Sequence, residues 1–131
     1  MLKKLKLKNV ALVEIIEINF EKGLNVFTGE SGSGKSLILD SLNSLFGGTN
    51  IPLNHLIRPG KNECLIQAIF EITPFVRDFL LDNNQCIPNN KLIISRNSFI
   101  KDSKVVSKFT LNDKAVKKNF LSELGSLLID F

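Results

Sequence analysis

The sequence predicts an α/β fold in which a glycine-rich, phosphate-binding loop joins a buried strand to a helix. Three observations predict it. Residues 29–36, Gly-Glu-Ser-Gly-Ser-Gly-Lys-Ser, match the pattern G-x-x-x-x-G-K-[ST] without a mismatch. Residues 24–28, Leu-Asn-Val-Phe-Thr, read as a short buried strand directly before this loop. Apolar side chains then recur at helical spacing up to Gly47-Gly48, where a helix is expected to end.

Each residue type in the loop suits a bound phosphate. Glycines let the backbone turn and approach an anion closely, and the N–H groups of the loop converge on it. A helix that begins at about Gly34 adds its unpaired N–H groups and its dipole. Lys35 is expected to reach the β- and γ-phosphates, as the one catalytic residue predicted, and the Ser36 hydroxyl to bind Mg²⁺. The candidate nucleotide-binding residues are Gly29, Glu30, Ser31, Gly32, Ser33, Gly34, Lys35 and Ser36.

Two strands are expected before the loop. Residues 3–9 alternate lysine with apolar side chains, and residues 13–20 place Ile16, Ile18 and Phe20 on one face. Residues 9–12 are the turn between them, so these two strands are predicted to pair antiparallel.

After the helix, residues 49–60 read as a polar loop punctuated by Pro52 and Pro59. Residues 64–72 alternate as a strand, and Thr73-Pro74 is a typical helix start, a cap followed by proline. That helix is expected to stop at residues 82–84.

The C-terminal third predicts a strand pair and one more helix. Residues 92–96 and 104–111 are the strands, joined around residues 101–103, and Asn112-Asp113 is a turn or a helix cap. A helical stripe from Val116 is expected to end at Gly125, and residues 127–131 to begin another buried strand. This last run resembles a Walker B strand, but Phe131 stands where an acid would follow, and we weigh that interpretation as the weaker one.

Composition bounds the remaining possibilities. The 131 residues suit one domain, and 44% hydrophobic and 23% charged residues are typical of a globular chain with a real core. Because no apolar run of about 18 residues is present, we expect a cytosolic protein without a membrane span. Cys64, Cys86 and His55 have no metal-ligand spacing, so we expect reduced thiols and a loop histidine.

The net charge of +4 permits contact with nucleic acid without showing it. The candidate DNA contacts are Lys3, Lys4, Lys6, Lys8 and Arg58. The lysine cluster is more typical of the solvated face of an edge strand, where lysine also blocks unwanted pairing. We therefore expect DNA binding to be weak at most.

These motifs together resemble the ATP-binding heads of the SMC-like ABC ATPases, in the branch that acts in bacterial DNA repair. The resemblance is strong around the loop and moderate along nearly all the rest of the chain. It is carried by residues 5–10, 23–36, 40–42, 45–48, Arg58, Gly60, residues 68–70, 111–112, Val116 and residues 124–131. Asp113 departs from the family, which usually has glycine there.

The resemblance implies that residues 1–131 are one partial ATP-binding head domain, the phosphate-loop lobe of a P-loop NTPase with a mixed sheet. By analogy, the Q-loop glutamine, a coiled coil, the signature motif and the Walker B carboxylates lie beyond this chain. It also implies ATP and Mg²⁺ as ligands, a second head as partner, and hydrolysis only with the missing half.

Two other enzyme classes and one non-enzymatic class remain open at this stage. An ABC transporter ATPase subunit shares the loop, although such subunits usually stack adenine on an upstream aromatic residue, often tyrosine, and this chain has no Tyr or Trp. A small P-loop kinase would need basic lid residues, and only Arg96 and scattered lysines are available late in the chain. The non-enzymatic class is the product of a broken or split gene that binds nucleotide weakly or not at all.

Overall fold

The computed structural model describes residues 2–20, 33–85 and 87–128. In this part of the chain the strands form one antiparallel sheet in the order β2-β1-β3-β4-β5-β6. The strands are β1 (Leu2–Val10), β2 (Val13–Asn19), β3 (Glu63–Glu71), β4 (Lys91–Lys101), β5 (Lys104–Leu111) and β6 (Lys114–Ala115). The helices are α1 (Ser33–Leu45), α2 (Leu53–Leu56), α3 (Pro74–Asp82) and α4 (Lys118–Leu128), with a 3₁₀ turn η3 (Pro88–Asn90).

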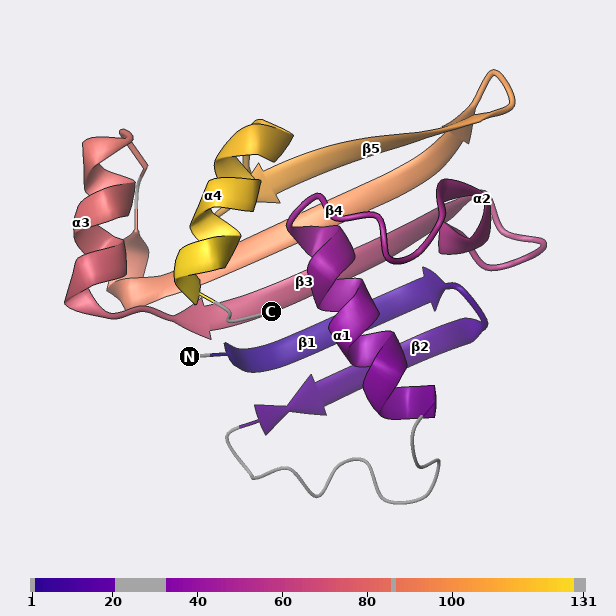
Figure 1. Cartoon of the computed structure of the whole chain (residues 1–131), viewed down its shortest axis with the longest axis horizontal. Coiled ribbons are helices and arrows are strands. Elements are labelled where there is room, and N and C mark those ends of the chain that lie inside the picture. Colours follow the sequence, from indigo (N-terminus) through magenta and orange to yellow (C-terminus); the bar gives the residue numbers. More distant parts are fainter. Residues whose placement is uncertain (1, 21–32, 86, 129–131) are drawn as a thin grey trace.

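The helices lie on one side of this sheet (Figure 1). α1 and α4 cross the same face, and α3 lies beside the ends of β3 and β4, where Phe79 stacks on Phe120 of α4 with ring centroids 5.7 Å apart. The core fills the space between α1 and the sheet, and fully burying one such leucine contributes about 1.5–3 kcal/mol. The phosphate-loop α/β fold class predicted from the sequence is confirmed.

The N-terminal hairpin forms as predicted, with β1 and β2 antiparallel and Ala11-Leu12 at the turn. However, β1 is not an edge strand, because it pairs with β2 on one side and with β3 on the other. Protection of an exposed edge therefore does not explain the lysines of β1.

α3 also begins as predicted. The hydroxyl of Thr73 accepts a hydrogen bond from the N–H of Val76 at 3.4 Å, and Pro74 occupies the first turn, where its missing N–H costs nothing.

Three regions differ most from the sequence predictions. Residues 49–60 hold the short helix α2 and three buried apolar anchors, so they are not merely a polar loop; the anchors are Ile51, Leu56 and Ile57. β4 continues from Arg96 to Lys101, because β3 and β5 pair with it on both sides. α4 continues through Gly125, and Leu127 and Leu128 are helical, so the predicted strand from residue 127 is wrong at these two positions.

Candidate functional site

The predicted phosphate-binding loop meets the described structure at its C-terminal half. Residues 21–32, including Gly29, Glu30, Ser31, Gly32 and the predicted strand 24–28, lie outside the described residues. α1 begins at Ser33, one residue before the predicted start, so Gly34, Lys35 and Ser36 lie in its first turn. Ser36 is exposed. A helix N-terminus at this position is what the phosphate-binding pattern requires.

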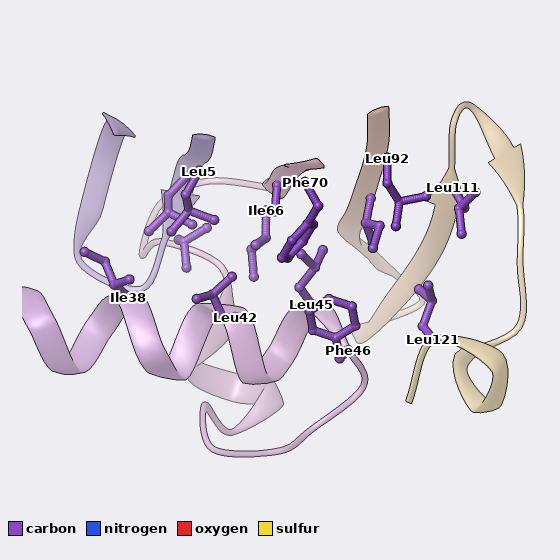
Figure 2. Packing of buried hydrophobic residues seen from close by; sticks show 14 of the residues in the cluster. Leu5, Ile38, Leu42, Leu45, Phe46, Ile66, Phe70, Leu92, Leu111 and Leu121 are labelled. Carbon is purple, nitrogen blue, oxygen red and sulfur yellow. The ribbon is translucent and has the colours of Figure 1, made fainter. Parts of the chain in front are cut away.

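The sheet fixes the direction of α1. Figure 2 shows Ile38, Leu42 and Leu45 pointing from α1 toward the sheet, where Leu5 and Ile66 meet them. Their spacing of three and four residues puts them on one helix face. Leu39, on another face of the same helix, remains 51% exposed.

The C-terminal end of α1 is closed by its own backbone. The N–H of Gly48 donates to the carbonyl of Asn43 at 2.8 Å, and the N–H of Gly47 donates to the carbonyl of Ser44 at 3.0 Å. This pair of bonds is a Schellman motif, which requires positive φ at the first residue past the cap. Gly47 has φ +89°, so the predicted helix end at Gly47-Gly48 is confirmed.

Arg96 of β4 attaches that same end of α1 to the sheet. Its Nη1 donates to the carbonyl of Ser44 at 2.7 Å, and its Nε donates to the hydroxyl of Ser107 at 3.0 Å. The guanidinium carbon lies 5.0 Å from the ring centroid of Phe109, and the side chain is buried. Within the described ranges no carboxylate pairs with Arg96, so the negative end of the helix dipole is its main electrostatic partner.

This role of Arg96 was not predicted from the sequence. A signal was present: Leu92, Ile94 and Arg96 share one face of β4, and the first two are fully buried. A lone arginine at a core position of an alternating strand indicates a buried polar partner.

Burial dominates the titration of two neighbouring groups. It lowers the pKa of Arg96, and it raises the pKa of the Cys64 thiol above its ordinary value, against the opposing effects of a hydrogen bond with Ser98 and of the Arg96 charge. Cys64 is a buried free thiol. This agrees with the expected reduced cysteine and gives it no exposed, reactive thiolate.

Arg58 is held beside the first hairpin. The backbone N–H of Arg58 donates to the carbonyl of Asn9 at 2.8 Å, and the Nη1 of Arg58 lies 3.7 Å from a carboxylate oxygen of Glu14. Nearby, the N–H of Ala11 donates to the carbonyl of Leu56 at 2.9 Å. The segment that carries α2 is therefore pinned to the end of β1, which places Arg58 at one end of the sheet.

The candidate lysines of β1 do not share one environment. Lys3 and Lys4 form ion pairs with Glu71 and Glu17, at 3.3 Å and 3.4 Å respectively. Lys6 and Lys8 lie further along the strand, and Lys8 is exposed.

Metal-binding clusters of His, Cys, Asp and Glu are absent from the described residues. His55 is exposed, but it lies on the short helix α2 and not in a loop as the sequence predicted. Leu127 and Leu128 are helical, which removes the strand that a Walker B interpretation of residues 127–130 would need; Asp130 lies outside the described residues. None of the helices described is long and apolar enough for a membrane span.

The comparisons with known proteins agree with this architecture. Residues 4–130 match the AAA domain family. The chain is 35% identical to the DNA repair protein RecN of Synechocystis sp. and 32% identical to the DNA repair protein RecN of Bacillus subtilis. Each alignment covers 99% of this chain and 22% of the relative, so the chain spans about a fifth of the length of these curated relatives.

Among solved structures, the fold is similar to that of the recombination mediator protein RecF in its ATP complex. The TM-score is 0.61 at 15% identity, over 88% of this chain and 27% of the other. This likeness supports the fold. The match over residues 4–130 shows that the chain belongs to the AAA domain family.

Proposed function

We propose that residues 29–36 bind the phosphates of ATP together with Mg²⁺, and that the chain supplies the phosphate-loop lobe of an ATP-binding head in a RecN-like DNA-repair ATPase. One observation carries this proposal: a complete G-x-x-x-x-G-K-[ST] pattern ends in the first turn of a helix that is anchored at its other end. Lys35 contacts the β- and γ-phosphates, and Ser36 binds the metal ion. The similarity to RecN favours this role over that of a transporter subunit or a small kinase.

Hydrolysis requires groups from outside these 131 residues. In phosphoryl transfer the protein must also orient the attacking water and hold the metal with a carboxylate. We place these groups in the remaining part of a RecN-like protein and in a second head that closes over the nucleotide. The protein acts in the bacterial cytoplasm, and nucleoid association follows from weak DNA contact by Lys3, Lys4, Lys6, Lys8 and Arg58.

Magnesium-dependent ATP binding tests the proposal. Equilibrium dialysis with and without Mg²⁺ is expected to show metal-enhanced binding by the wild type. Ser36→Ala should lose the enhancement, whereas Ser122→Ala, an exposed serine on α4, should keep it. Binding that ignores the metal, or an equal response in both variants, would overturn the assignment of Ser36.

A turnover assay tests the second half of the proposal. The isolated chain is expected to hydrolyse ATP no faster than background, because no group that could take the proton of the water is identified in it. Multiple turnovers that disappear in Lys35→Ala would contradict this expectation and point to a missed carboxylate, with Asp130 the first candidate.

A further inference from the structure

The sheet has a second face, opposite α1 and α4, and among the described residues no helix lies over it (Figure 1). Residues paired directly across antiparallel strands project to the same side. Leu5 and Ile66 project toward α1, so their neighbours along each strand project away from it. We call this side the open face.

The strand register brings lysines from both halves of the chain onto the open face. Seven lysines and three glutamates project from it: Lys4, Lys6, Lys8, Lys91, Lys101, Lys104 and Lys108, with Glu17, Glu63 and Glu71. Seven positive less three negative charges give +4, and the whole chain, with 17 basic and 13 acidic residues, also carries +4. The net charge of the protein is thus concentrated on one side of its sheet.

One cross-strand row joins the two groups of lysines. Lys8 is paired with Leu65, Leu65 with Asn97, and Asn97 with Lys108. Three strand spacings separate the two lysines by about 14 Å. Lys8, Leu65, Asn97 and the neighbouring Phe99 line a shallow hollow, and the Nζ of Lys108 lies 5.7 Å from the centroid of the Phe99 ring.

Ion pairs among the described residues do not account for Lys8 and Lys108 of this row or for Lys6 beside it, and a free sheet edge does not account for the two lysines of β1. β1 is paired on both sides, so Lys6 and Lys8 do not protect a free edge, whereas Lys108 lies on the part of β5 that β6 leaves unpaired. In the described part of the chain, Lys6, Lys8 and Lys108 form no ion pair, unlike Lys3 and Lys4. Like charges held on one rigid surface repel one another, and a polyanion relieves that repulsion.

We propose that the open face binds the phosphate backbone of DNA, with Lys6, Lys8 and Lys108 as its principal contacts. The choice of DNA as the polyanion rests on the proposed repair function, but the surface itself follows from the register and the charges. Backbone contact is independent of base sequence. Three phosphate contacts predict affinity about 40-fold weaker at 200 mM salt than at 50 mM.

Fluorescence anisotropy with a short labelled duplex at 50 mM salt tests this surface without any nucleotide, so failure of ATP binding does not affect the result. The variant is Lys8→Glu/Lys108→Glu. The matched control is Lys61→Glu/Lys117→Glu, which changes two exposed lysines outside the open face. Both variants reduce the net charge from +4 to zero. The first is expected to weaken binding at least about tenfold and the control less than about threefold.

Circular dichroism verifies that both variants fold. The variant Lys6→Gln/Lys8→Gln provides a milder second test and is expected to show a smaller loss of affinity for the duplex. Equal losses in variant and control, or no binding by the wild type at 50 mM salt, would overturn the proposal. Tighter binding of the wild type to phosphatidylserine vesicles than to the duplex would also overturn it, since the surface would then serve an anionic membrane.

Discussion

The two ends of α1 differ in what marks them: a contiguous sequence motif at one end and tertiary contacts at the other. At its N-terminal end, the sequence supplies two glycines, a lysine and a serine at the fixed positions of the G-x-x-x-x-G-K-[ST] pattern, which suits the backbone to a phosphate. At its C-terminal end, contacts from distant parts of the chain close the helix: the Schellman turn at Gly47, Arg96 from β4, and Phe46 against Gly125 of α4.

The difference shows why one end was predictable and the other was not. Phosphate binding uses backbone N–H groups, so its requirements are local and appear as a contiguous motif. The anchoring contacts join residues that are far apart in the sequence: Arg96 lies 52 positions from Ser44, and Gly125 lies 79 positions from Phe46. Such pairing becomes visible only when the sheet is assembled. We therefore expect changes at the C-terminal end to lower stability, and changes at the N-terminal end to lower nucleotide affinity alone.

The largest expected effect on stability is that of Leu45→Ala. Leu45 is fully buried between α1 and the sheet, and its truncation should reduce the free energy of unfolding by about 3 kcal/mol. Leu39→Ala on the exposed side of the same helix is the control and should cost less than about 1 kcal/mol. Urea unfolding followed by circular dichroism compares them, and equal losses would mean that α1 does not dock as described.

Arg96→Met should lower the free energy of unfolding by about 2 kcal/mol. The substitution keeps the buried volume, but it loses two hydrogen bonds and the positive charge at the helix end. Arg77→Met on the exposed side of α3 should be close to neutral. If the two arginine variants unfold at the same urea concentration, Arg96 is not an anchor.

The sequence predicted most elements of this fold but not all their limits. Alternation identified β1, β2 and β3, and the Thr73-Pro74 pair identified the start of α3. The predicted strand ended at Arg96, yet pairing with β3 as far as Phe99 and with β5 as far as Lys101 extends β4 to Lys101.

Glycine signals were ambiguous without the tertiary structure. Gly47 ends a helix because its φ is positive, whereas Gly125 lies inside α4, where a Cβ would come within 2.8 Å of the Phe46 ring. Asp113, in a position where the resembled family usually has glycine, nevertheless keeps φ at +68°, so the turn with Asn112 is a mirror-image hairpin turn despite the substitution.

Substitution of Gly47 should sharpen the description of the helix end. Gly47→Ala is expected to lower the free energy of unfolding by about 1–2 kcal/mol, because φ of +89° is unfavourable for an L-residue and the new Cβ would contact the Lys118 side chain. Gly60→Ala isolates the backbone contribution, since Gly60 has φ of +85° and open space around it. Thermal unfolding should show the larger loss for Gly47→Ala; the reverse order would argue against contact between α4 and this turn.

The smallest expected effect is a pH dependence from Cys64. Its folded pKa is raised by burial, so its contribution to stability is present below the ordinary value of 9.0 and is lost as pH rises. Wild-type unfolding free energy should fall between pH 8 and pH 10 by up to about 1.4 kcal/mol more than that of Cys64→Ala, in reducing buffer. Parallel pH profiles for the two proteins would show that the thiol is not shielded from water.

We propose that the N-terminal end of α1 and the loop before it form the nucleotide site. Isothermal titration calorimetry of ATP–Mg²⁺ into the wild type and Lys35→Ala tests it most directly, with Lys61→Ala as an exposed-lysine control. We predict weak but measurable binding by the wild type and the control, and no detectable binding by Lys35→Ala at unchanged stability. Equal affinity of the wild type and Lys35→Ala for ATP–Mg²⁺ would show that this loop is not the nucleotide site.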